Sequence, residues 1–197
     1  MYLSPETTLL LVPGLRDHVA EHWQTLLQAE LQTTQQKVAS VAPLEHDKLS
    51  CAARMDALDK ALAEIDGPVI LAAHSAGVMI TVHWARHLFH KVPRGKIRGA
   101  LLATPADLET PMPAGYPDRA TLEVRGWLPI PREPLPFPTI LAASRNDPLA
   151  TFERAAEMAC DWGSDLVDLG KVGHLNPAAG YGPWPRAKEL LAQLQRR

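Results

Sequence analysis

The sequence predicts an α/β fold built on a doubly wound, mainly parallel sheet of about six strands with helices on both faces. The first observation is a series of short apolar runs, which are typical of strands buried on both faces. The second is that segments with helical spacing of apolar residues separate these runs. Strands that alternate with helices form parallel sheets, and right-handed crossovers place the helices on both sides. The predicted strands are 7–12, 38–41, 69–73, 97–103, 139–143 and 166–169.

Helical spacing is found in four segments besides the one that follows residue 75. Their apolar positions are Trp23, Leu26, Leu27 and Leu31; Met55, Leu58, Leu62 and Ile65; Phe152, Ala155, Ala156 and Ala159; and Leu190, Leu191 and Leu194. The chain has 197 residues and shows no internal repeat. That length is typical of one domain. We therefore expect a single domain over residues 1–197.

The composition excludes several function classes. With 20 Lys and Arg against 22 Asp and Glu, the net charge is −2, which gives no general electrostatic reason to bind nucleic acid or an anionic membrane. Two cysteines cannot form a dense disulfide framework and fit a reducing compartment. The N-terminal stretch 1–6 has no basic residue, and the apolar run 9–12 is too short for a signal sequence or a membrane span. We expect a soluble, cytoplasmic protein without nucleic-acid or membrane partners.

Proline is unevenly distributed. The chain has 18 prolines in 197 residues, and nine of them lie between residues 105 and 138. A helix cannot run through most of that stretch, because an interior proline removes a donor and clashes with the preceding turn. The segment joins two predicted strands, so we expect an ordered, extended, cap-like segment over residues 105–138. Its apolar contacts would be Met112, Tyr116, Trp127, Leu128 and Ile130.

The segment 69–80 carries the strongest functional signal. An apolar strand leads into His74-Ser75-Ala76-Gly77, and an apolar helical pattern follows at once. This arrangement matches a nucleophile elbow, in which a serine stands on a sharp turn between strand and helix. The usual pattern is G-x-S-x-G, and Ala73 replaces its first glycine. Alanine is still small, so we predict Ser75 as a nucleophile; the alternative is a capping serine in a small-residue turn.

A nucleophilic serine needs a base and an acid, which follow it in the order Ser, Asp/Glu, His in this type of fold. His174 is the one histidine beyond the serine helix and its exit, and it follows the strand 166–169. Asp147 follows the strand 139–143 in a turn stiffened by Pro148. Asp168 is the rival acid, although it lies inside a strand pattern. We predict His174 as the base and favour Asp147 as the acid.

Two backbone N–H groups are candidates for stabilising an oxyanion. The N–H of Ala76 lies at the start of the serine helix, where free donors and the helix dipole favour negative charge. The second donor should come from the loop after the first strand, where Gly14 permits close approach and Leu15 follows it. Leu15 and Ala76 are therefore the predicted oxyanion donors.

Motifs along nearly the whole chain resemble the retinoblastoma-binding protein 9/YdeN-like serine hydrolases, which are compact α/β-hydrolases. The motifs are Pro13-Gly14-Leu15, Glu21-His22-Trp23, His74-Ser75-Ala76-Gly77, Ser144-Arg145-Asn146-Asp147-Pro148, Phe152-Glu153-Arg154-Ala155, Gly173-His174-Leu175-Asn176 and Gly180-Tyr181-Gly182-Pro183-Trp184-Pro185. The resemblance implies a triad of Ser75, His174 and Asp147 and an esterase-like or aminopeptidase-like activity on a small-molecule or peptide substrate. No metal or organic cofactor is expected.

One property of that family does not carry over. The human member is named for binding retinoblastoma protein through an L-x-C-x-E motif, and the corresponding segment here, Leu49-Ser50-Cys51-Ala52-Ala53, lacks the glutamate. We therefore do not expect that partner.

Three other interpretations are weaker. His83, His87 and His90 at helical spacing could bind a metal, but no H-E-x-x-H pattern accompanies them, and a partly exposed basic helix end accounts for them better. A dinucleotide-binding domain lacks its G-x-G-x-x-G loop. A non-catalytic hydrolase-fold interaction module is the serious alternative, against which the three triad candidates argue.

Overall fold

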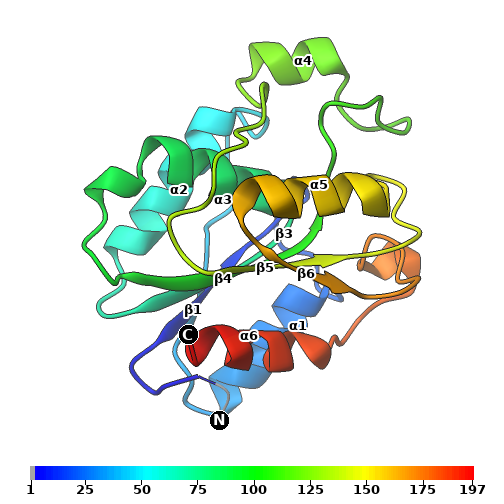
Figure 1. The fold of residues 1–197 in the computed structure, drawn as a ribbon. Coiled ribbons are helices and arrows are strands. Elements are labelled where there is room, and N and C mark those ends of the chain that lie inside the picture. The colour runs from blue at the N-terminus through cyan, green and yellow to red at the C-terminus, as the bar shows by residue number, and fades with distance from the viewer. Residues whose placement is uncertain (1–2) are drawn as a thin grey trace.

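A computed structural model describes residues 3–197, so Met1 and Tyr2 of the N-terminal stretch lie outside the described residues. Six strands form one sheet in the order β2-β1-β3-β4-β5-β6, and every neighbouring pair is parallel (Figure 1). The predicted α/β class, strand number and parallel sheet are thereby confirmed. The strands are β1 (Thr8–Val12), β2 (Val38–Ser40), β3 (Val69–Ser75), β4 (Ile97–Pro105), β5 (Thr139–Ala143) and β6 (Asp165–Asp168).

Helices cover both faces of the sheet. The helices α2, α3 and α5 pack on one face, and α1 and α6 pack on the other (Figure 1). Their bounds are α1 (Trp23–Thr33), α2 (Cys51–Ala63), α3 (Ala76–His87), α5 (Phe152–Trp162) and α6 (Arg186–Gln195), with a short α4 (Arg119–Val124) and the 3-10 turns η1 (Phe89–Lys91) and η2 (Pro177–Ala179). No helix among residues 3–197 is long and apolar enough to cross a membrane.

The core explains why the central strands read as continuous apolar runs. All five residues of β1 and of β5 are buried, because helices cover both of their faces. Alternate side chains of one strand join opposite cores: Leu10 and Val12 pack with α2 and α3, whereas Leu9 and Leu11 pack with α1 and α6. The outer strands β2 and β6 are less buried. The prediction is least accurate at β3 and β4, which each extend two residues beyond the predicted apolar run, to Ser75 and Pro105.

The proline-rich segment leaves β4 and returns to β5 over the helical layer that contains α3 and α5 (Figure 1). Its one helix, α4, has six residues and fits between Pro117 and Pro129. Trp127 is 1% exposed, and its indole N–H donates to the Leu49 carbonyl at 2.7 Å. Trp127 therefore fastens the segment to the chain before α2 instead of facing a ligand.

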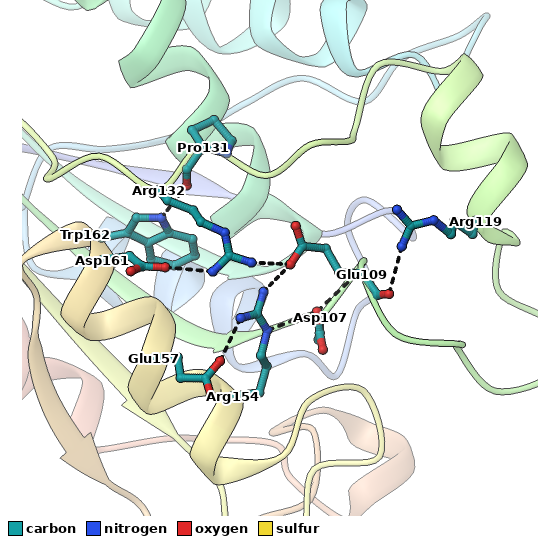
Figure 2. Close-up of polar contacts among 9 residues, drawn as sticks. All are labelled: Asp107, Glu109, Arg119, Pro131, Arg132, Arg154, Glu157, Asp161 and Trp162. Carbon is teal, nitrogen blue, oxygen red and sulfur yellow. Dashed lines mark hydrogen bonds and ion pairs between the residues drawn. The ribbon is translucent and has the colours of Figure 1, made fainter.

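An ion-pair cluster fastens both ends of the same segment to α5 (Figure 2). Arg154 on α5 pairs with Glu109 and with the buried carboxylate of Asp107, its Nε lying 3.4 Å from Asp107 Oδ1. Arg132, near the far end, joins Glu109 Oε2 at 2.5 Å and Asp161 Oδ2 at 3.0 Å. Because several partly buried charges share partners, the cluster restrains the segment better than isolated surface pairs would.

Candidate active site

Ser75 occupies the sharp turn between β3 and α3. Its backbone has φ 57° and ψ −125°, a conformation that costs a non-glycine residue about 1–3 kcal/mol and is typical of functional sites. A Cβ on Gly77 would lie 2.1 Å from the Val12 carbonyl oxygen, so no larger residue fits there. Ala73, by contrast, lies fully buried within β3 opposite Val12, where its methyl group is accommodated. This explains why the turn tolerates alanine at the first position of the pattern and requires glycine at the second.

Three predicted side chains form a continuous hydrogen-bonded chain. His174 Nε2 lies 2.8 Å from Ser75 Oγ, and His174 Nδ1 lies 2.8 Å from Asp147 Oδ2 and 3.0 Å from Asp147 Oδ1. The side chains of His174 and Asp147 are 6% and 3% exposed. A carboxylate that accepts from Nδ1–H leaves Nε2 unprotonated and directed at the serine hydroxyl, which is the tautomer a general base requires.

Backbone groups of Leu149 fix the loop that carries Asp147. Leu149 N–H donates to Asp147 Oδ1 at 2.9 Å, and the Leu149 carbonyl accepts from Asp107 N–H at 2.8 Å. The acid is thereby linked to the first residues of the proline-rich segment.

Asp168 does not approach His174. It ends β6 with a partly exposed carboxylate that accepts from Arg145 Nε at 2.7 Å and from Gly170 N–H at 2.8 Å. The hydrogen bond from Arg145 lowers the pKa of the Asp168 carboxyl below its usual value. Asp168 is therefore a surface ion-pair residue, and the arrangement of the site favours Asp147 over its rival.

The loop that carries the base is fastened by residues outside the predicted set. His74 Nε2 donates to the His174 carbonyl at 2.9 Å. Asn146 Oδ1 accepts from Gly173 N–H at 2.7 Å and from Ser144 Oγ at 3.0 Å. The sequence signal for Asn146 was its place beside Asp147, but its role in holding the histidine loop depends on β5 and β6 being neighbours.

The two predicted oxyanion donors line the same cavity as Ser75. Ala76 is the first residue of α3, so its N–H is one of those that lack an intrahelical acceptor. Leu15 lies in the loop after β1, and within residues 3–197 its N–H has no hydrogen-bond acceptor. A Cβ on Gly14 would lie 3.3 Å from Ser75 Cβ, which shows how closely this loop approaches the serine. Both N–H groups are thus available to a ligand.

Arg54 anchors the loop after β1 through hydrogen bonds and an ion pair. It lies on α2, is 4% exposed, and donates to the carbonyl oxygens of Leu15 at 3.3 Å and Lys48 at 2.7 Å. Its Nη1 also pairs with Asp17 Oδ1 at 3.1 Å. The sequence gives no signal for this role of Arg54. The contact exists only because the fold places α2 next to the loop after β1.

A cavity of about 140 Å³ opens beside the hydrogen-bonded chain and includes Ser75, His174, Leu15 and Ala76 in its lining. Met112 and Tyr116 bring the proline-rich segment to its wall, whereas Leu128 and Ile130 pack into the core. The other apolar lining side chains are Val19, Ala106, Leu108, Pro177 and Ala178. Only part of the proline-rich segment therefore reaches the site.

The helix histidines do not form one exposed face. His83 is buried and its Nε2 donates to the Trp127 carbonyl at 3.0 Å. His87 ends α3, and His90 lies in the separate turn η1. Over residues 3–197, no group of three or more His, Cys, Asp or Glu side chains is placed to hold a metal ion. The expectation of a partly exposed basic helix end was wrong for His83, because that ring packs beneath the proline-rich segment.

Comparison with known proteins identifies the family. The chain matches the serine hydrolase family over residues 9–193. The chain belongs to this family. A solved structure of a putative YdeN-like hydrolase from Pectobacterium atrosepticum shares 32% identity, covers 96% of this chain and 91% of its own, and superposes with a TM-score of 0.73. The resemblance to YdeN-like serine hydrolases of the α/β-hydrolase superfamily is thereby confirmed, and the protein is a hydrolase.

More distant structures share the fold. The ydeN gene product of B. subtilis is 16% identical, with 97% of this chain and 100% of that chain covered and a TM-score of 0.72. An N-formylmaleamic acid deformylase from Pseudomonas putida is also 16% identical, with 86% of each chain covered and a TM-score of 0.64. No match is found among curated protein sequences.

Proposed function

We propose that this serine hydrolase cleaves a carboxylic ester or amide bond through an acyl-enzyme intermediate, with Ser75 as nucleophile, His174 as general base and Asp147 as the orienting acid. The observation that carries the proposal is the hydrogen-bonded chain of two 2.8 Å contacts from Ser75 Oγ through His174 to Asp147. The strained turn beneath Ser75 and the cavity beside it support the same role.

The proposed reaction has two halves. His174 Nε2 takes the Ser75 proton as Oγ attacks the substrate carbonyl, and Asp147 stabilises the imidazolium that forms. The N–H groups of Leu15 and Ala76 stabilise the oxyanion; one such donor is typically worth about 10²–10³ in rate. His174 then protonates the leaving oxygen or nitrogen, and finally activates a water that hydrolyses the acyl-enzyme. Apart from the substrate and one water molecule, every step uses groups of the chain itself.

The lining of the site supports a small acyl group. A cavity of about 140 Å³ is close to the size that holds a benzene ring in an engineered protein core, about 150 Å³. A second groove also includes His174 in its lining, together with Asn146, Lys171 and Asn176. A leaving group that takes its proton from His174 could depart through this groove. Both esters and amides fit such an arrangement.

Labelling with a fluorophosphonate probe tests the nucleophile. We expect wild type to be labelled and Ser75→Ala to be unlabelled, because the probe forms its bond to an activated serine oxygen. Ser164→Ala is the matched control, because the Ser164 hydroxyl forms a hydrogen bond with Thr139 and lines no part of the site. Labelling that persists in Ser75→Ala would contradict the proposal. An unlabelled wild type that also hydrolyses no ester, amide or peptide would favour the non-catalytic interaction module.

A further inference from the structure

His22 has a local role that fixes which of its ring nitrogens carries a proton. It is the N-cap of α1, and its Nδ1 accepts a hydrogen bond from Gln24 N–H at 3.3 Å. A nitrogen that accepts carries no proton, so the proton of the neutral ring is on Nε2. Burial, with a smaller effect from His174, lowers the pKa of His22 to about 4, so the ring is neutral at pH 7.

The N–H that results is available to a ligand. Within residues 3–197, His22 Nε2 has no hydrogen-bond acceptor, and the side chain lines the same cavity as Ser75. The ring lies 4.5 Å from that of His74, which in turn lies 4.9 Å from that of His174, as measured between ring centroids. His22 therefore contributes a neutral donor to a cavity whose wall is otherwise largely apolar.

Gln24 contributes an acceptor to the same cavity. Its Nε2 donates to the carbonyl oxygens of Ala72 at 2.9 Å and Val12 at 3.2 Å. Carbonyl oxygens only accept, so the orientation of the amide is fixed and Oε1 points away from them. No donor among the described residues 3–197 reaches Oε1, although Gln24 is 4% exposed and lines the cavity.

A free donor and a free acceptor would be costly to cover with a purely apolar ligand, because each would lose its hydrogen bond to water. We propose that the cavity selects a short acyl group ending in a carboxamide, whose oxygen accepts from His22 Nε2–H and whose nitrogen donates to Gln24 Oε1. The inference rests on the proposed function and names the acyl class that the same site prefers. His22 and Gln24 are specificity-determining residues in it.

Three p-nitrophenyl esters of equal size test this preference: 4-methylpentanoate, 4-oxopentanoate and succinamate. The 4-methylpentanoate ends in an isopropyl group, which forms no hydrogen bonds. The 4-oxopentanoate ends in a methyl ketone, which only accepts, and the succinamate ends in a carboxamide, which accepts and donates. Rates are corrected for the spontaneous release of p-nitrophenol. We expect kcat/KM to rise about tenfold from the 4-methylpentanoate to the 4-oxopentanoate, and about tenfold again to the succinamate. Each step adds one neutral hydrogen bond, for which a gain of this size is typical. Equal kcat/KM for all three would overturn the inference.

A variant separates selectivity from capping. Serine is a good N-cap, so His22→Ser retains a cap for α1 and removes the Nε2 donor. We expect the ratio of the 4-oxopentanoate to the 4-methylpentanoate to fall to about one, whatever happens to the absolute rates. Ser50→Ala, which removes the side-chain cap of α2 at Ala53 N–H, is the matched control and should leave the ratio unchanged.

The outcomes are distinct from those of the proposed function. A ratio that His22→Ser leaves as in wild type would show that His22 only caps the helix, and would overturn the inference. An enzyme that is labelled at Ser75 and shows no preference overturns this inference alone. An enzyme that is neither labelled nor active on any of the three esters overturns the proposed function and the inference with it.

Discussion

At the scale of single residues, two aspartates at the carboxyl ends of the neighbouring strands β5 and β6 have different surroundings. Asp147 is buried against His174 and accepts from a backbone N–H, whereas Asp168 is partly exposed and paired with Arg145. Asp147 is a buried carboxylate whose partner is the imidazole of His174, so it can stabilise the positive charge that develops on that ring. An exposed carboxylate that is already paired with a guanidinium contributes much less.

Substituting the two aspartates should therefore give different kinetics. We expect Asp147→Asn to lower kcat by up to about 10⁴, because an amide at that position favours the wrong imidazole tautomer. Asp168→Asn is the control and should change kcat by no more than a few-fold. Steady-state hydrolysis of a p-nitrophenyl ester measures both. A large loss in Asp168→Asn with little effect in Asp147→Asn would mean that the acid is assigned to the wrong residue.

At the scale of elements, the site depends on how closely the β3–α3 turn packs against the loop after β1. Gly77 lies against the Val12 and Pro13 carbonyls, and Gly14 lies against Ser75. Arg54 supports the same loop from α2. Leu15, the proposed oxyanion donor, thus takes its position from contacts made by three separate elements.

Gly77→Ala tests this packing. Its Cβ would meet backbone oxygen at 2.1 Å, so the loop after β1 must move, and we expect destabilisation of about 3 kcal/mol or more with loss of fluorophosphonate labelling. Gly95→Ala is the control: its φ of +80° makes alanine cost about 1–2 kcal/mol, but nothing lies within 4 Å of the new methyl group. Urea denaturation and labelling should show a less stable but fully labelled Gly95→Ala. Normal labelling of Gly77→Ala would contradict the packing argument.

At the scale of the whole molecule, buried neutral histidines link stability to pH. Burial lowers the pKa values of His22, His74 and His83 below the usual value of 6.5. Between the lowered pKa values and 6.5, the unfolded chain binds more protons than the folded one. The free energy of unfolding therefore falls as the pH is lowered through this range.

Urea denaturation at pH 7 and pH 5 checks this dependence. We expect a lower free energy of unfolding at pH 5, with each such histidine contributing at most about 1.4 kcal/mol per pH unit. His83→Gln can still donate to the Trp127 carbonyl but cannot titrate, so it should reduce the difference between the two pH values. Equal or greater stability of the wild type at pH 5 would contradict the prediction.

The local pattern was enough to predict all six strands and the parallel sheet. It also named Ser75, His174 and Asp147, which the structure brings within hydrogen-bonding distance of one another. Strands buried on both faces are apolar throughout, and helices carry apolar residues on the side that faces the core. Burial therefore produces both sequence patterns. The predicted bounds were least accurate at the carboxyl ends of β3 and β4, because these strands end in His74-Ser75 and Thr104-Pro105, which interrupt the apolar run. The α/β class therefore followed from the sequence alone.

Only the tertiary structure shows which of the candidate residues meet. The sequence favoured Asp147 over Asp168. In the structure, Asp147 lies beyond β5 and contacts His174, whereas Asp168 ends β6 and pairs with Arg145. The roles of Arg54, His74 and Gln24 likewise depend on contacts between elements far apart in the chain. The sequence by itself determined the fold class and supplied the candidate site residues. The packing of strands and loops decided which of them meet, because distances across the sheet are set by register and not by sequence separation.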